Sequence, residues 1–125
     1  GLTRKYIDSA QLVEITEFSA LPAMRVAPEH PSATTDRYLA PAQEFELSLV
    51  HLRAGEHAAR NRGVLVPGEG PRVLIGTGGR VTVRLDEARG GQSLELARGQ
   101  AAFVSAAERD LWAWGEGSFA QVGAP

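Results

Sequence analysis

Apolar and polar residues alternate with a period of two along most of the chain after residue 43. Phe45, Leu47 and Leu49 fall on one face of an expected strand. The phase slips at Val50 and Leu52, which indicates either a bulge or a strand covered on both faces. Similar alternation returns over residues 73–75, 81–85, 94–96, 102–104, 111–114 and 119–122. Short strands about ten residues apart, with Gly-rich turns between them, predict an all-β sandwich or barrel.

One pair of glycines stands out among the expected turns. Gly78 and Gly79 lie between two alternating stretches. Both central residues of a tight hairpin turn often need φ > 0, which glycine adopts without steric cost. The sequence therefore predicts a hairpin at this point.

The first third of the chain follows other patterns. Asp8 is a suitable N-cap with Gln11 three residues later, and an apolar stripe follows, which predicts one short helix within residues 1–20. Residues 21–42 contain four prolines, which favours an extended linker across the surface. We therefore expect three parts: a helical segment over residues 1–20, a linker over 21–42 and a β-sandwich over 43–125.

Composition narrows the function classes. A chain of 125 residues suits one domain. Thirteen basic and fifteen acidic side chains give a net charge of −2 without a basic patch, so neither nucleic acid nor a membrane surface is an expected partner. No apolar run approaches the ~20 residues of a membrane-spanning helix. The absence of cysteine excludes disulfides and thiolate metal sites. It fits a cytoplasmic location and also fits a secreted protein.

The three histidines do not form a metal-binding pattern. A zinc site needs a close His pair with a further ligand such as a carboxylate, and His51 and His57 do not supply one. His51 continues the face of Leu47 and Leu49, which predicts a histidine at the edge of the core. His57 lies in an expected turn, and His30 lies among prolines, so both are expected in solvent. We expect no metal ligand and no cofactor-binding residue in this chain.

Other catalytic patterns are also missing. No serine lies in a Gly-x-Ser-x-Gly elbow, and the glycine clusters do not open a helix after a strand, so they are turn glycines. Trp112 and Trp114 occupy alternate strand positions, which predicts at least one indole in the core; stacking on a sugar is the alternative. The residues alone indicate an all-β domain without a catalytic constellation of its own.

Two stretches resemble a known family. Gly1-Leu-Thr-Arg-Lys-Tyr-Ile-Asp8 is similar to the Gly-Leu-Thr-Pro-Lys-His-Ile-Asp segment of type I, zinc-dependent mannose-6-phosphate isomerases. The stretch from Tyr38 to Leu47 resembles the Tyr-x-x-Pro-x-x-Glu-Phe segment that opens the last domain of that family. The later strands are similar too, so the resemblance covers essentially the whole chain. It implies a cupin-like jelly-roll β-sandwich, the C-terminal domain of such an enzyme.

The resemblance also implies a chemistry. The family interconverts mannose 6-phosphate and fructose 6-phosphate, with zinc held by residues that precede the matched segment, so zinc belongs to the parent enzyme. Lys5 matches an active-site position, where its ammonium would pair with substrate oxygens or phosphate. A solvated surface lysine is the alternative, although Lys5 is the single lysine beside twelve arginines. Arg4 stands where the family usually has proline.

These features lead to one main expectation and one alternative. The chain opens at Gly1 inside a family motif, so we expect the C-terminal fragment of an isomerase, without the N-terminal catalytic domain that binds zinc and sugar phosphate. By itself such a chain is expected to be inactive. The alternative is a free-standing, non-catalytic cupin that binds carbohydrate or a protein partner.

Overall fold

The computed structural model describes residues 25–54, 63–85 and 91–124. Within these residues the fold is all-β and every strand pairing is antiparallel. The strands are β1 (Glu29–Ser32), β2 (Thr35–Tyr38), β3 (Glu46–Leu52), β4 (Val64–Val66), β5 (Arg72–Leu85), β6 (Ser93–Ala97), β7 (Ala101–Val104) and β8 (Leu111–Gly123). The helix expected within residues 1–20 lies outside the described residues.

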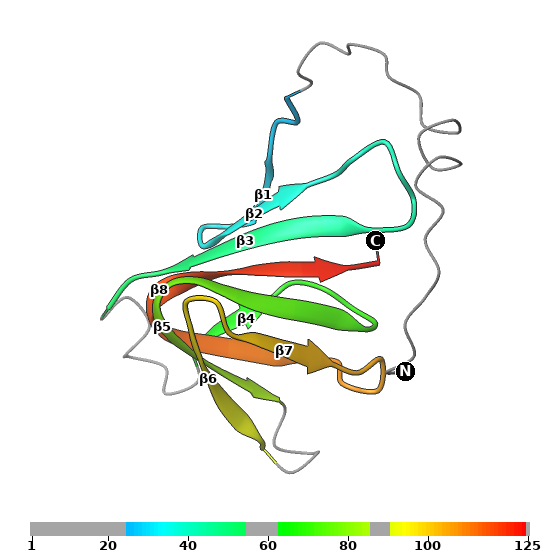
Figure 1. The fold of residues 1–125 in the computed structure, drawn as a ribbon. Helices are drawn as coiled ribbons and strands as arrows, with labels where there is room; N and C mark the ends of the chain where they lie inside the picture. Colours follow the sequence, from blue (N-terminus) through cyan, green and yellow to red (C-terminus); the bar gives the residue numbers. More distant parts are fainter. Residues whose placement is uncertain (1–24, 55–62, 86–90, 125) are drawn as a thin grey trace, which may run out of the picture.

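Two long central strands organise the sheet. β5 and β8 pair from Arg72 opposite Gly123 to Leu85 opposite Leu111, and both curve midway along their length (Figure 1). The sheet is therefore folded over on itself into two halves. The first half-sheet contains β1, β2, β3, residues 117–123 of β8, residues 72–76 of β5, and β7. The second half-sheet contains β4, residues 111–115 of β8, residues 80–85 of β5, and β6.

The hydrophobic core fills the space between the two half-sheets. The first half-sheet contributes the fully buried Val50, Leu74 and Phe119, and the second contributes Leu96 and Leu111. Side chains from two sheet layers that pack on each other make a sandwich. The predicted all-β sandwich is confirmed. Among residues 25–54, 63–85 and 91–124, no helix is long and apolar enough to cross a membrane.

The hairpin predicted at Gly78 and Gly79 is wrong. β5 runs through both glycines without a turn, and its register with β8 shifts between Gly76 and Gly78. Gly79 has φ 58°, and a Cβ there would collide with the Glu116 carbonyl oxygen. The glycines therefore serve a bulge and a bend at close backbone approach, which is the other common use of glycine within a strand.

Two strands occur within the stretch expected to be a linker. β1 and β2 pair with each other, and β2 pairs with β3, so residues 29–38 extend the first half-sheet. β1 is its outermost strand and contains Pro31. Proline cannot donate a ladder hydrogen bond and is therefore tolerated on an edge strand. Proline content alone did not reveal this position.

The face assigned to the core in β3 is the outer face. Ser48, Val50 and Leu52 are buried, whereas His51 is exposed. The expectation that His51 lies at the core edge is therefore wrong. Both faces of this strand carry apolar side chains, since Leu47 and Leu49 on the outer face are half-buried. Periodicity alone could not distinguish the two faces.

The two tryptophans also point away from the core. Leu111 and Ala113 are buried between the half-sheets, and Trp112 and Trp114 alternate with them on the outer face, half-buried. The expectation of an indole in the sandwich core is wrong. Arg84 lies over Trp114, with the guanidinium carbon 5.6 Å from the ring centroid, which is a cation–π contact.

Candidate functional site

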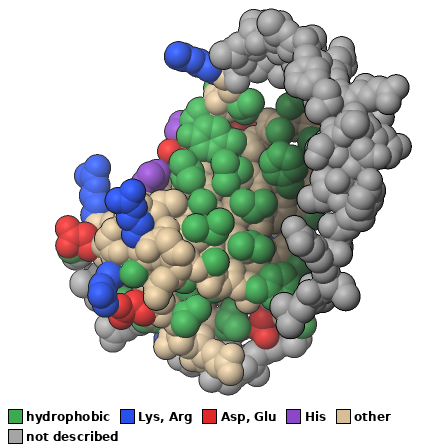
Figure 2. All heavy atoms as spheres, viewed as in Figure 1, with side chains coloured by type: hydrophobic (Ala, Val, Ile, Leu, Met, Phe, Trp, Pro, Cys, Tyr) green, Lys and Arg blue, Asp and Glu red, His purple; other side chains and the backbone are tan. Residues whose placement is uncertain are grey.

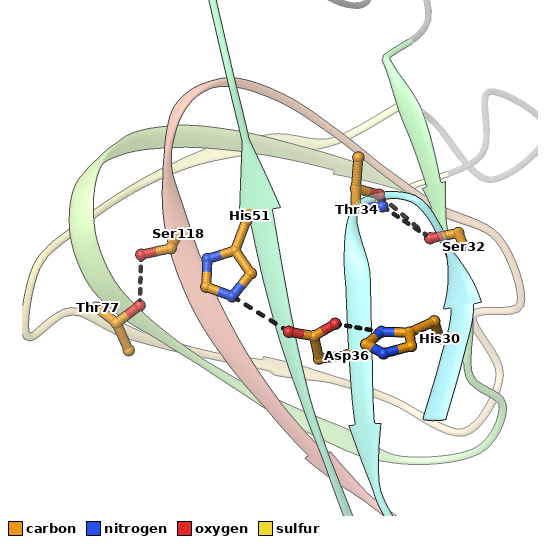
Figure 3. A network of polar contacts seen from close by, with 7 residues as sticks. All are labelled: His30, Ser32, Thr34, Asp36, His51, Thr77 and Ser118. Atoms are coloured by element: carbon orange, nitrogen blue, oxygen red, sulfur yellow. Dashed lines mark hydrogen bonds and ion pairs between the residues drawn. The ribbon is translucent and has the colours of Figure 1, made fainter. Parts of the chain in front are cut away.

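A polar network crosses β1, β2 and β3, the three strands at one edge of the first half-sheet (Figure 3). His30 comes from β1, Asp36 from β2 and His51 from β3. The Asp36 carboxylate lies 2.8 Å from His30 Nδ1 through one oxygen and 3.9 Å from His51 Nε2 through the other. The two histidine side chains are 67% and 58% exposed, so water competes for these contacts. Exposed pairs of this kind contribute little to stability.

Hydroxyl groups lie beside this network. Ser32 and Thr34 are 3.2 Å apart at the β1–β2 turn, and Thr77 and Ser118 are 2.8 Å apart across β5 and β8 (Figure 3). The Ser118 hydroxyl is hydrogen-bonded to the Thr77 hydroxyl, which is not a general base. An activated serine needs a base within hydrogen-bond reach. These hydroxyls therefore do not form a nucleophilic site.

Metal binding is a separate question. Within residues 25–54, 63–85 and 91–124, no three His, Asp or Glu side chains are arranged to hold a metal ion. His30, Asp36 and His51 come nearest by composition, but they are spread over three exposed strands. The described residues therefore do not fit a zinc ion, which needs three or four converging ligands. His57 lies outside the described residues.

A buried arginine joins two loops at one end of the sandwich. Arg72 is only 1% exposed, and its Nη2 donates to the carbonyl oxygens of Arg109, at 3.1 Å, and Glu108, at 3.5 Å. Its Nη1 donates to Gln121 Oε1 at 3.4 Å, and Gln121 Nε2 donates to the Pro67 carbonyl at 2.7 Å. The residues before β5 and before β8 are thus fixed through one guanidinium.

Burial lowers the pKa of Arg72, while the nearby carboxylates of Asp110 and Glu69 act in the opposite direction. Its Nε has no hydrogen-bond partner in the part of the chain that the structure describes. The sequence did carry a signal for this residue, because Arg72 occupies an inward position in phase with Leu74. The role of Arg72 is to hold loops, since both of its terminal nitrogens, Nη1 and Nη2, donate to the protein's own groups.

An apolar cleft opens between β6 and β7, which belong to different half-sheets and do not pair with each other. Its volume is about 410 Å³, and most of its lining comes from apolar residues such as Leu74, Val83 and Leu94. Gln92 and Ser93 are polar, but no lining side chain is ionisable. Acid–base catalysis requires a titratable group near the substrate. This cleft can hold an apolar group and cannot move protons.

Lys5 and the rest of the Gly1–Asp8 motif lie outside the described residues. The structure therefore does not bring Lys5 together with any other residue discussed above. The described residues offer a structural network, a loop anchor and an apolar cleft, and none of the three is a catalytic centre.

The sequence of this chain is similar to that of known enzymes over nearly its whole length. No family model matches the chain. Mannose-6-phosphate isomerase from Escherichia coli K12 is 30% identical over 124 residues, and the enzyme from Salmonella typhimurium LT2 is 32% identical over 129 residues. Each match covers 98% of this chain and 29% of the relative.

Solved structures agree with this result. The Salmonella typhimurium mannose 6-phosphate isomerase bound to its substrate, fructose 6-phosphate, and to zinc superimposes with a TM-score of 0.67 at 30% identity. Its zinc-bound holo form gives the same TM-score and identity. Each alignment covers 98% of this chain and 29% of the solved chain. The chain thus spans about 29% of the length of these relatives and corresponds to their C-terminal part.

Proposed function

Because this chain is the counterpart of the C-terminal part of mannose-6-phosphate isomerases, we propose that it is the C-terminal domain of an enzyme that interconverts mannose 6-phosphate and fructose 6-phosphate. The observation that carries the proposal is the extent of the match. Sequence and backbone both align over 98% of the chain. A free-standing cupin of unrelated function would not be expected to keep such a match end to end.

In this proposal the domain supports catalysis without containing the metal centre. The described residues bring no set of zinc ligands together. The resemblance implies zinc ligands that precede the matched segment, so we place zinc in the part of the isomerase polypeptide that this chain does not match. When bound there, zinc would act as a Lewis acid on the sugar oxygens. A cytoplasmic location is part of the proposal.

Lys5 is the residue of this chain that we assign to the active site. It lies in the segment that resembles the family motif Gly-Leu-Thr-Pro-Lys, and it is the single lysine of the chain. A lysine ammonium is a compact point charge that can donate to a phosphate or sugar oxygen. Its role would be to bind and orient the substrate.

The test uses the longer isomerase polypeptide that contains this chain. A charged hydrogen bond to substrate contributes about 1.5–3 kcal/mol. We therefore expect Lys5→Ala to lower kcat/KM about ten- to a hundred-fold, at about 1.4 kcal/mol per factor of ten. Lys5→Arg should recover only part of the loss, because a planar guanidinium places its charge differently.

Arg98→Ala is the matched control, because Arg98 is an exposed cation in the turn between β6 and β7. It should leave the kinetics unchanged. A Lys5→Ala enzyme that keeps its zinc content and full kcat/KM would show that Lys5 is an ordinary surface lysine. The domain would then contribute only through packing.

A further inference from the structure

The outer face of the first half-sheet carries two cross-strand rows of mainly apolar side chains. The strand registers place Leu47, Val122, Val73 and Phe103 in one row and Leu49, Ala120, Ile75 and Ala101 in the next. Phe45 extends the same face just before β3. We call these nine residues the apolar outer face. Figure 2 shows hydrophobic side chains gathered over this half-sheet.

Several of these side chains are strongly exposed. Phe103 is 70% exposed, Phe45 47%, and Val73 and Ile75 40% each. An antiparallel sheet with one solvated face normally alternates apolar and polar residues. Here the strands are apolar on the core side and on the outer side. Contiguous exposed apolar surface of this kind marks a site of contact with another protein surface.

The second half-sheet provides a contrast within the same domain. Its outer face carries the ion pair between Arg80 and Glu95, 2.6 Å apart, and the contact of Arg84 with Trp114. The Arg80 and Glu95 side chains are 76% and 55% exposed, as expected for a face in water. The two outer faces therefore differ in chemistry, and the apolar one is suited to contact.

The occupant follows from what the relatives contain beyond the matched part. About 70% of the length of each relative has no counterpart in this chain. The described chain begins at residue 25, just before β1, and β1 is the outermost strand of the first half-sheet (Figure 1). Polypeptide that precedes residue 25 therefore joins the domain at the edge of this half-sheet.

We propose that the apolar outer face is the surface through which this domain packs against the remainder of the isomerase polypeptide. This inference rests on the proposed function. The surface that contacts it should be apolar at its centre, opposite Val73 and Ile75. Asp36 is the cross-strand partner of Leu49, so the network of His30, Asp36 and His51 borders the face. It would form part of a polar rim, the usual arrangement of a protein interface.

Hydroxyl-radical footprinting read by mass spectrometry tests the proposal. The 125-residue chain is compared with the longer isomerase polypeptide that contains it. Phe103 reports on the apolar outer face, and Leu65 in β4, which is 46% exposed on the second half-sheet, is the matched reference. Phe103 should be reactive in the 125-residue chain and lose most of that reactivity in the longer polypeptide. Leu65 should be equally reactive in both.

Within the longer polypeptide, Ile75→Lys should restore the reactivity of Phe103, whereas Leu65→Lys should leave it protected. This second comparison does not depend on how the shorter chain behaves. The proposal is overturned if Phe103 is as reactive in the longer polypeptide as it is in the 125-residue chain. It is also overturned if Phe103 is already protected in the 125-residue chain, at all concentrations or increasingly with concentration, because the chain itself or a second copy would then cover the face.

The readout is independent of catalysis. A longer polypeptide that protects Phe103 but does not isomerise mannose 6-phosphate would support the interface and contradict the proposed function. An active enzyme in which Phe103 stays reactive would do the reverse.

Discussion

Gly79 of β5 and Gly117 of β8 are cross-strand partners at the bend between the two half-sheets, and a Cβ on Gly79 would lie 2.8 Å from the Gly117 Cα. Real Cβ atoms essentially never approach another atom so closely. A side chain at either glycine would collide with the backbone of the other strand, so β5 and β8 could not stay paired through the bend. The pair therefore allows one continuous sheet to form both layers of the sandwich.

Replacing Gly79 by alanine should destabilise the domain more than replacing Gly99. The two glycines have similar positive φ, 58° and 83°, but a Cβ on Gly99 would meet no atom within 4 Å. Gly99→Ala should cost about 1–2 kcal/mol of unfolding free energy from its left-handed backbone alone. Gly79→Ala should cost about 2–5 kcal/mol, because the steric collision adds to that term. Urea unfolding measures both, and equal losses would contradict the packing described at the bend.

Arg72 should be important for stability although it is charged and buried. Arg72→Ala removes the donors to Gln121 and to the Arg109 carbonyl and leaves space beside them, so we expect a loss of roughly 2–5 kcal/mol. Arg72→Lys should recover only part, because it lacks the forked donors. Arg80→Ala is the control: its side chain is 76% exposed, and an exposed ion pair is worth about 1 kcal/mol or less. An Arg72→Ala protein as stable as Arg80→Ala would show that the loops are held by other contacts.

The aromatic residue that stabilises the core is Phe119. Its side chain is completely buried, so Phe119→Ala should lower the free energy of unfolding by about 3–5 kcal/mol. Trp112 is half-buried on the outer face, and Trp112→Ala should cost about 1–2 kcal/mol. Thermal or urea denaturation gives the order directly. A larger loss at Trp112 than at Phe119 would mean that the inner and outer faces of β8 are assigned the wrong way round.

The fold class could be predicted from the sequence, but which face of each strand is buried could not. In β3 and just before it, the alternation of Phe45, Leu47 and Leu49 was visible, and so was the second apolar set that includes Val50 and Leu52. Which set is buried depends on the layer that packs against it, and that layer comes from residues far along the chain. The same limit explains the tryptophans, because Leu111 and Ala113 were equally suitable for the core.

The bend was harder to predict than the strands. A Gly-Gly pair suits a hairpin turn and a bulge equally well, and only the continuous pairing of β5 with β8 decides between them. For the candidate site, residue patterns gave no catalytic group. Lys5 came from resemblance to a family, and its position stays a prediction. Arg72 had a signal in its inward phase with Leu74, but an arginine at such a position is not usually assigned to a core.

The measurement that tests the central claim most directly is an isomerase assay with mannose 6-phosphate, followed through the formation of fructose 6-phosphate with zinc present. It is run in parallel on the 125-residue chain and on the longer polypeptide that contains it. The account predicts turnover by the longer polypeptide, lost on chelation and restored by zinc, and no turnover by the 125-residue chain. A folded, zinc-loaded longer polypeptide that leaves mannose 6-phosphate unchanged, or turnover by the 125-residue chain itself, would contradict it.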